Sequence, residues 1–162
     1  MPVHEDDIDW SGVGPGSTGF RRKQLGAAAG GERLGCSLYE LPAGEQAWPY
    51  HYHAGNEEAL FVLSGTGTLR LAGEHHPLSS GTYVALPTGE EGGHRVVNDS
   101  DEVLRYLVIS TMNDPDVTVY PDSATFGVYA GSPPGGDEDD RILSGYFRQE
   151  NGVDYWEDVV DE

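Results

Sequence analysis

From Leu34 onward the chain shows short stretches of strand length, separated by Pro, Gly, Asn and Asp; apolar and polar residues alternate in 68–72, whereas 58–64 is apolar on both faces. Alternation with period two is typical of strands, because successive strand side chains point to opposite faces; no segment keeps the 3.6-residue period of a helix. The pattern predicts strands at 34–41, 47–53, 58–64, 67–72, 82–86, 94–98 and 103–111, and an edge-type strand at 117–121. Short strands with regular turns predict an all-β fold, a sandwich or barrel.

The ends of the chain differ from this middle region. Residues 1–33 are rich in glycine and charge, and we expect an N-terminal arm with one or two short strands, one near Phe20 to Leu25. Residues 34–122 are the expected barrel core. The extension 123–162 is acidic, but it also carries Ile142, Leu143, Tyr146, Phe147, Tyr155 and Trp156. So many apolar side chains predict that it packs on the barrel or on a second subunit.

Two histidines mark the predicted strand 47–53. His51 and His53 are two residues apart, so both project from the same face of a strand. Glu58 follows five residues later, and His94 comes after a long turn-rich stretch. Three imidazoles and one carboxylate suit a divalent metal of borderline softness, and they leave coordination positions open if it takes five or six ligands. These residues therefore predict a metal site that can hold a small molecule.

The amino-acid composition limits the partners and the cellular location of the protein. The formal charge is -19, from 28 acids against 9 bases, so nucleic acid and anionic membranes are unlikely partners. A folded middle with an acid-coated surface is typical of proteins that work in molar salt, where the screening length is only about 3 Å. No run reaches the roughly 18 apolar residues of a membrane span, and the acidic N-terminus does not have a secretion signal's pattern. With one cysteine, Cys36, these features predict a cytoplasmic protein.

Two motifs connect the histidines to a known family. Gly44-x6-His51-x-His53-x4-Glu58-x6-Gly65 resembles the first cupin motif with one extra residue before the first histidine. Gly81-x5-Pro87-x-Gly89-x4-His94-x3-Asn98 resembles the second, with two extra residues between its glycine and its histidine. The longer loop and Tyr120-Pro-Asp122 are similar to an uncharacterised group of single-domain cupins. The resemblance covers about residues 34–122 and implies a cupin-type jelly-roll barrel.

The same resemblance implies four metal ligands: His51, His53, Glu58 and His94. Glu57 also satisfies the looser form of the motif, but Glu58 is preferred because six residues separate it from Gly65, and Glu57 would face the opposite side of the strand. Gly65 and Gly81 are expected in tight turns with positive φ. His75 and His76 are expected in a polar surface turn at 73–77, outside the site.

The strands next to the ligands supply the candidates for the pocket wall. Leu60 and Val62 share the face of Glu58 and Asn98 that of His94, although Asn98 is interpreted as a polar turn residue more than as a ligand. From the last strand Tyr106 is the candidate, with Val108; the opposite parity would present Arg105 and Leu107 instead. Arg70 and Arg105 are the two strand arginines that could attract an anion, but pairing with surface acids is the favoured reading.

Function stays open between three hypotheses. The first is a mononuclear metalloenzyme acting on a small polar organic molecule; the resemblance implies dioxygenases, isomerases and lyases as the main classes. The second is a non-catalytic small-molecule-binding or sensor module whose metal organises the pocket, and the third is a closed, purely structural metal site. The expected cofactor is one divalent ion, Zn, Mn, Fe or Ni. The resemblance and the aromatic extension also predict a homodimer.

Overall fold

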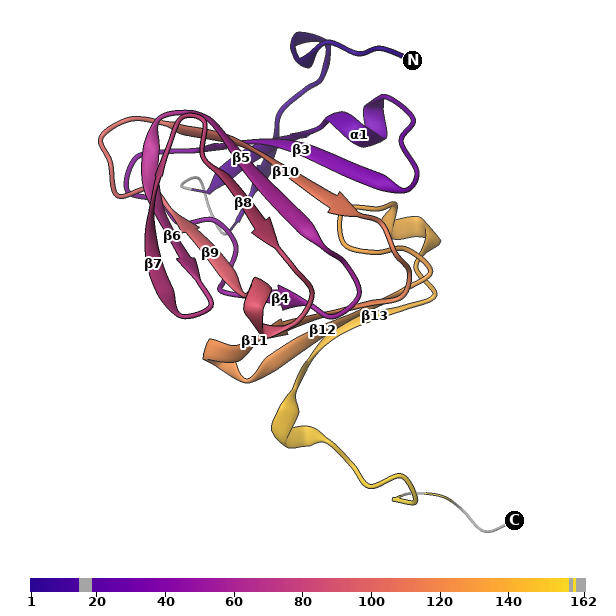
Figure 1. Ribbon diagram of the computed structural model, residues 1–162. Coiled ribbons are helices and arrows are strands. Elements are labelled where there is room, and N and C mark those ends of the chain that lie inside the picture. The colour runs from indigo at the N-terminus through magenta and orange to yellow at the C-terminus, as the bar shows by residue number, and fades with distance from the viewer. Residues whose placement is uncertain (15–18, 158, 160–162) are drawn as a thin grey trace.

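A computed structural model describes residues 1–14, 19–157 and 159 of the chain (Figure 1). These residues form thirteen strands and one α-helix, α1 (Leu25–Ala28). The first sheet has six antiparallel strands in the order β1-β2-β3-β10-β5-β8. Their bounds are Ser11–Val13 for β1, Phe20–Gln24 for β2, Leu34–Leu41 for β3, Leu104–Thr111 for β10, Glu58–Ser64 for β5 and Tyr83–Leu86 for β8.

The opposite layer consists of two smaller antiparallel sheets. One has the order β13-β12-β11-β4 and the other β7-β6-β9. Their bounds are Tyr52–His53 for β4, Thr66–Leu71 for β6, Glu74–Ser79 for β7, His94–Val97 for β9, Asp116–Tyr120 for β11, Thr125–Ala130 for β12 and Leu143–Arg148 for β13. Isolated bridges His51–His94 and Gln46–Val97 join the two sheets edge to edge.

Together the layers enclose one interior, with β11, β12 and β13 on its lower side in Figure 1. Short 3-10 helices lie in the connections, at Glu5–Asp7, Glu90–Gly92, Pro121–Ser123, Glu138–Asp140 and Gln149–Asn151. This architecture confirms the predicted all-β jelly-roll barrel. No helix within the described ranges is long and apolar enough to cross a membrane.

The predicted strands are found, with two local differences. Strands 34–41 and 58–64 have the predicted bounds, whereas 47–53 shortens to Tyr52–His53 with single bridges before it. The expected turn at 73–77 is wrong beyond Gly73: residues 74–77 lie in β7, which pairs with β6 along its whole length. Pro77 is tolerated there because β7 is an edge strand, where the missing proline N–H interrupts no ladder.

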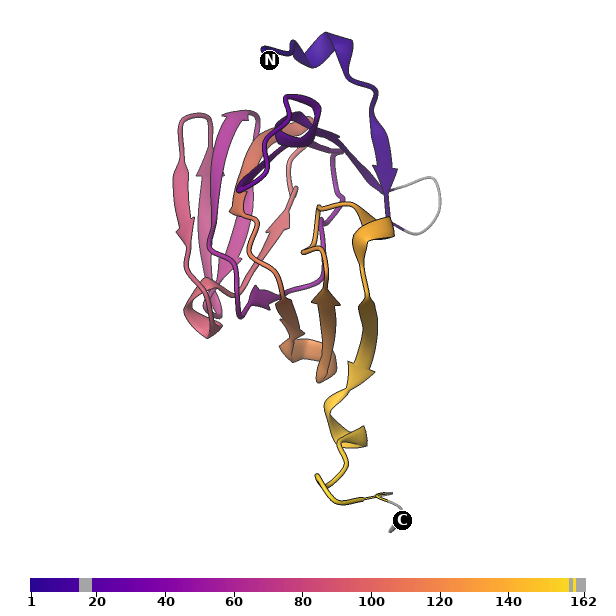
Figure 2. The ribbon, with the colours of Figure 1, turned by 90° about the vertical axis from the view of Figure 1, so that its right-hand side faces the viewer.

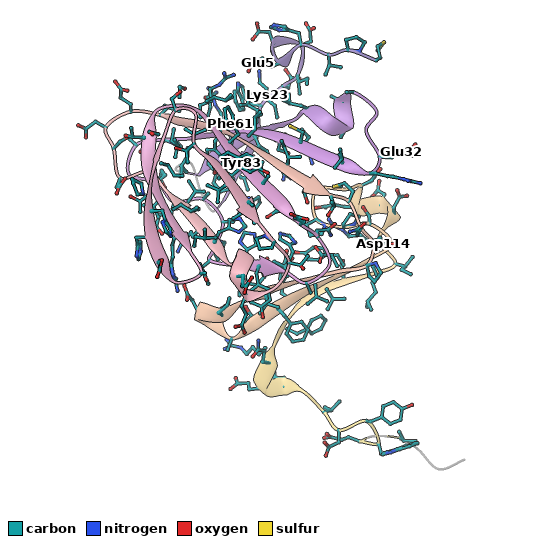
Figure 3. All side chains as sticks on the ribbon, in the orientation of Figure 1. Glu5, Lys23, Glu32, Phe61, Tyr83 and Asp114 are labelled. Carbon is teal, nitrogen blue, oxygen red and sulfur yellow. The ribbon has the colours of Figure 1, made fainter. Side chains whose placement is uncertain are left out.

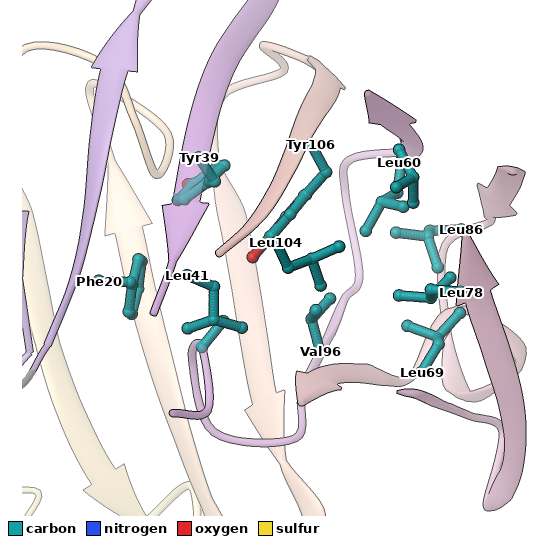
Figure 4. Close-up of a cluster of buried hydrophobic side chains, with 12 residues drawn as sticks. Phe20, Tyr39, Leu41, Leu60, Leu69, Leu78, Leu86, Val96, Leu104 and Tyr106 are labelled. Atoms are coloured by element: carbon teal, nitrogen blue, oxygen red, sulfur yellow. The ribbon is translucent and has the colours of Figure 1, made fainter. Parts of the chain in front are cut away.

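One end of the interior is filled by apolar side chains (Figure 4). The alternating residues of both layers meet there, and Leu41, Val62 and Leu104 are fully buried. Burying such a side chain stabilises the fold by about 1.5–3 kcal/mol. The cluster consists of Phe20, Tyr39, Leu41, Ala47, Leu60, Val62, Leu69, Leu78, Leu86, Val96, Leu104 and Tyr106.

The predicted arm 1–33 is part of the first layer, because β2 pairs with β3 and β1 with β2. Lys23, the sole lysine of the chain, is buried beneath it and donates from Nζ to the Glu5 carbonyl oxygen over 2.7 Å. Its ammonium also lies 4.6 Å from the Trp10 ring centroid. Figure 3 shows Glu5 and Lys23 at the same end of the barrel. Through these contacts Glu5 and Trp10 pack against the first sheet.

The C-terminal extension continues the second layer. The expected boundary at residue 122 falls within the β11–β12 hairpin, and β13 then adds to β12 in full register. After β13 the chain leaves the barrel and extends away from it (Figure 2). Ile142, Tyr155 and Trp156 are 85%, 85% and 75% exposed. The backbone of the extension therefore joins the barrel, while none of the described residues covers several of its apolar side chains.

Candidate metal centre

The three histidines of the two motifs meet on the inner face of the second layer. His53 lies on β4, and His51 forms the bridge to His94 at the start of β9. The alternation in His51-Tyr52-His53 keeps both imidazoles on the inside, as predicted from their spacing. All three side chains are buried, and the ring centroids of His51 and His94 are 4.6 Å apart.

Glu58 faces these histidines from the first residue of β5. Its Oε2 lies 3.5 Å from His53 Nε2 and 3.6 Å from His94 Nε2. The ligand atoms of His51, His53 and Glu58 all lie within 4.8 Å of one another. Ligand atoms that share one ion each lie about 2.0–2.2 Å from it, so at most about 4.4 Å separates any two of them. The separations of 3.5 and 3.6 Å fall within that limit, and the 4.8 Å bound lies close to it. His51, His53 and Glu58 could therefore hold a metal, and His94 adjoins them through Glu58.

Each histidine has its Nδ1 atom occupied by an acceptor. His51 Nδ1 lies 2.7 Å from the Pro49 carbonyl oxygen, and His94 Nδ1 lies 2.8 Å from that of Gly92. His53 Nδ1 lies 2.7 Å from Asp116 Oδ2. A carbonyl or carboxylate oxygen only accepts, so Nδ1 carries the proton in all three rings. In the neutral form of each ring the Nε2 lone pair is then available, which is the tautomer that a metal requires. The donor set thus fits a divalent ion.

Asp116 is a functional candidate that the sequence did not single out. Its carboxylate is completely buried on β11, and its Oδ1 accepts hydrogen bonds from the backbone N–H groups of Gly55 and Val117. Both oxygens are therefore held in place, and Oδ2 orients the ring of His53. A carboxylate behind a ligating histidine fixes its orientation and raises its basicity. The predicted strand 117–121 begins one residue after Asp116, and the contact of Asp116 with His53 spans 63 residues.

The surroundings shift the three imidazole pKa values in different directions. Burial, together with His94 and His53, lowers the pKa of His51 to about 3. Burial also lowers the pKa of His94, although Glu58 opposes the shift. Burial works in the same direction at His53, but the hydrogen bond to Asp116 and the charge of Glu58 outweigh it and raise its pKa. His51 and His94 are thus neutral and ready to ligate at neutral pH.

A cavity of about 540 Å³ opens in front of these ligands. Leu60 and Tyr106 line it, as do Val108 and the partly buried Cys36, so β10 has the parity that presents Tyr106 and Val108. Val62 shares the face of Leu60 but lies deeper, in the apolar core, and is not part of the cavity wall. The four proposed ligands all line the cavity.

Asn98 also lies outside the cavity wall, which corrects its place among the pocket candidates. Its Nδ2 donates to the carbonyl oxygens of Leu41 and Glu102, over 2.8 and 2.6 Å. Its Oδ1 accepts from the N–H and the hydroxyl of Ser100. The side chain is fully engaged in shaping the turn after β9. This agrees with its interpretation as a turn residue.

The remaining charged candidates have surface roles. Arg105 pairs with Glu5 and Glu40, and Arg70 forms two hydrogen bonds to Asp122, so neither guanidinium faces the metal centre. Glu57 is exposed and meets Thr111 through its backbone. His75 and His76 lie exposed on β7, far from the cavity lining. Their surface reading holds, although they lie in a strand and not in a turn.

A wall of hydroxyl groups faces the metal centre from β11, β12 and β13, and the sequence analysis missed it. Thr118 and Tyr120 of β11, Tyr129 of β12 and Tyr146 of β13 all line the cavity. The hydroxyls of Tyr129 and Tyr146 are 2.6 Å apart, and the Tyr120 ring lies 5.9 Å from His51. Burial raises the pKa of Tyr120 and of Tyr129, so both phenols stay protonated.

This fold and donor set define a class, the β-barrel proteins with a set of possible metal ligands between their two layers. Residues 37–110 match the family model Cupin_2, a cupin domain. The matched segment contains all four candidate ligands. It ends before β11, so Asp116, Thr118 and the three tyrosines lie beyond it.

Similar proteins of known description include several enzymes. Quercetin 2,3-dioxygenase of Bacillus subtilis is 31% identical over 93 residues, which is 55% of this chain but only 27% of that enzyme. A protein of Acidithiobacillus ferrooxidans to which sugar phosphate isomerase activity has been attributed is 28% identical, with a TM-score of 0.73 over 90% of this chain and 83% of that one.

A sugar phosphate isomerase of the cupin superfamily from Silicibacter pomeroyi gives a TM-score of 0.77. It is 24% identical and covers 93% of this chain and 94% of that one, a likeness that shows the fold alone. The relatives are thus enzymes of more than one reaction class. The fold they share does not select among those reactions.

Proposed function

We propose that this protein is a metal-dependent cupin that binds a small polar organic molecule at a mononuclear centre and transforms it. His51, His53, Glu58 and His94 would hold one divalent ion, which polarises a bound carbonyl or hydroxyl group or, as iron, supports oxygen chemistry. The observation that carries this proposal is the placement of the Nε2 atoms and Glu58 at the wall of a cavity of about 540 Å³. A purely structural site would be closed on all sides.

Side chains and backbone carbonyls of the protein would orient the metal ligands and shape the space beside them. Asp116 holds the ring of His53, and the backbone carbonyls of Pro49 and Gly92 hold those of His51 and His94. Leu60 and Val108 present apolar surface beside the ligands, which limits water around a bound molecule. Glu58, 12% exposed, is a ligand that can also accept a proton from a bound molecule.

The metal is tested first. Protein purified without added ions would be subjected to elemental analysis, then stripped and reloaded with iron, manganese, nickel or zinc. We expect one ion per chain, and a His53→Ala variant that binds none. Metal content unchanged by that substitution would show that the ligand assignment is wrong.

Turnover is tested next, on the same reloaded samples. Each would be offered a panel of small acids, sugars and phenols, with oxygen uptake and product formation as readouts. We expect conversion with one preferred metal. Binding without conversion under every metal would instead assign the chain to the non-catalytic binding cupins.

We also propose that the chain forms a homodimer in a salt-rich cytoplasm. Leu143 and Phe147 are 59% and 46% exposed on β13, which is an edge strand, and exposed apolar edges favour pairing with another chain. The acidic composition and the single cysteine support a salt-rich, reducing cytoplasm as the environment of the protein. A charge of -19 favours a small molecule over nucleic acid or a membrane as ligand. Sedimentation in molar salt should give a dimer that Phe147→Asp weakens and Tyr83→Asp, on the opposite edge strand β8, leaves intact. A wild-type monomer would contradict this.

A further inference from the structure

A buried hydroxyl without a partner lies beside the metal centre. Among the described residues, two buried side-chain polar atoms lack any hydrogen-bond partner: Thr118 Oγ1 and Arg95 Nε. Thr118 is 2% exposed and lines the cavity. Buried polar groups in native proteins are nearly always paired, and the exceptions call for a cause such as a ligand. Thr118 is the one that lies opposite a candidate metal ligand.

The strand register places this hydroxyl next to His53. Thr118 on β11 and His53 on β4 are direct partners in the antiparallel ladder, so their side chains project from the same face. Asp116, two residues earlier on that face, holds the ring of His53, and Tyr120, two residues later, lies 5.9 Å from that of His51. One face of β11 thus supplies a support for the metal ligand, a free hydroxyl and an aromatic ring.

The neighbouring strands extend this surface. Tyr129 and Tyr146 share a hydrogen bond of 2.6 Å, and in such a pair only one hydroxyl donates to the other. The Tyr120 hydroxyl adjoins this pair, and its ring centroid lies 6.2 Å from that of Tyr146. We call Thr118, Tyr120, Tyr129 and Tyr146 the hydroxyl wall. It offers donors and flat apolar rings at once, which suits a ring or chain bearing several hydroxyls.

The charged side chains that line the cavity indicate whether it favours a neutral or an anionic molecule. Apart from Glu58, the cavity is lined by four carboxylates, those of Glu32, Asp137, Glu138 and Asp140, and by the arginines Arg22, Arg95 and Arg141. Arg141 is engaged with Glu138 over 3.5 Å and with the carbonyl oxygens of Ser132 and Pro133. The side chains outside the metal centre thus carry no positive excess that would attract a phosphate or carboxylate, and the charge of the whole chain opposes anions.

We propose that the hydroxyl wall binds a neutral polyhydroxylated molecule while one of its oxygens occupies the metal centre, and that Thr118 Oγ1 contacts a hydroxyl or carbonyl oxygen of that molecule. This rests on the proposed function, because it assumes the metal. Thr118 is then a specificity-determining residue. The wall lies beyond the segment 37–110 that matches the cupin model, so it is a property of this chain and not of the shared motif.

The test uses calorimetric titration of the metal-loaded full chain with D-fructose and D-ribose, and with their phosphates, fructose 6-phosphate and ribose 5-phosphate. We expect the neutral sugars to bind more tightly than the phosphates. Thr118→Val removes the hydroxyl and keeps the shape, and it should weaken sugar binding about three- to tenfold. Thr118→Ser, which keeps the hydroxyl, should stay within about twofold of the wild type.

Stability and metal content separate this role from a structural one. Because Thr118 Oγ1 has no hydrogen-bond partner among the described residues, Thr118→Val should melt at the same temperature as the wild type or above it, with one metal per chain. A wild type without metal would refute the proposed function itself. Metal-loaded protein that binds no neutral sugar, or that prefers the phosphates, would overturn the ligand class. Equal sugar affinity in Thr118→Val and wild type would overturn the role of Thr118.

Discussion

Asp116 accepts the Nδ1–H of His53 over 2.7 Å from a carboxylate that is completely buried and is itself held by two backbone N–H groups. Asp116 thus orients the His53 ring so that its Nε2 faces Glu58. Asp116 lies on β11, outside the segment that matches the cupin model. The candidate metal centre therefore involves β11 as well as the two histidine motifs.

Asp116→Asn should weaken metal binding by about 10- to 100-fold, because an amide orients His53 less strongly and does not raise its basicity. The affinity would be measured by competition with a chelator of known strength. Asp122→Asn is the matched control, since Asp122 is an exposed aspartate paired with Arg70 at the surface. Equal affinity in Asp116→Asn and Asp122→Asn would show that the contact with His53 has no bearing on the metal.

Glu58→Gln and Glu57→Gln form a pair that tests the choice between two adjacent glutamates. Glu58 faces His53 and His94, whereas Glu57 is exposed. We expect Glu58→Gln to lower metal occupancy strongly, because it removes the only anionic ligand of the set, and Glu57→Gln to keep one ion per chain. Metal loss in Glu57→Gln alone would reverse the assignment. Elemental analysis after gel filtration measures both.

Metal binding near neutral pH should release at most one proton per ion, from His53, and not three. The pKa of His51 is about 3 and that of His94 is lowered, so both are already neutral, whereas that of His53 is raised. Metal affinity is therefore level above the pKa of His53 and falls as the pH drops through it, because protons then compete for Nε2. Calorimetry in buffers of different ionisation enthalpy counts the protons. A count near three would contradict the neutral state of His51 and His94.

Gly65→Ala should destabilise the protein more than Gly73→Ala, although both glycines have φ of +85°. A Cβ at Gly73 meets nothing within 4 Å, so its cost is the left-handed backbone alone, about 1–2 kcal/mol. A Cβ at Gly65 would lie 2.5 Å from the Val103 carbonyl oxygen, which adds about 1–3 kcal/mol of overpacking. Denaturant unfolding of both variants gives the difference. Equal losses would mean that the turn can shift away from Val103.

Much of this architecture follows from local pattern. The bounds of β3 and β5 could be predicted because turn residues flank these two stretches, and the pairing of His51 with His53 on one face follows from the period of a strand. The positive φ at Gly65 and Gly81 was likewise expected. Where local pattern was weak the prediction failed: β7 reads as a polar turn because its Pro77 and histidines are tolerated at a sheet edge.

The sequence by itself determined the class of fold, the face shared by His51 and His53, and the preference for Glu58 over Glu57, since each depends on spacing along one strand. Only the tertiary structure decided that β10 presents Tyr106 and not Arg105, that Val62 and Asn98 lie outside the cavity wall, and that Asp116 and Thr118 stand beside His53. The physical reason is that strand register is set by pairing between residues more than 60 positions apart, which no local periodicity records.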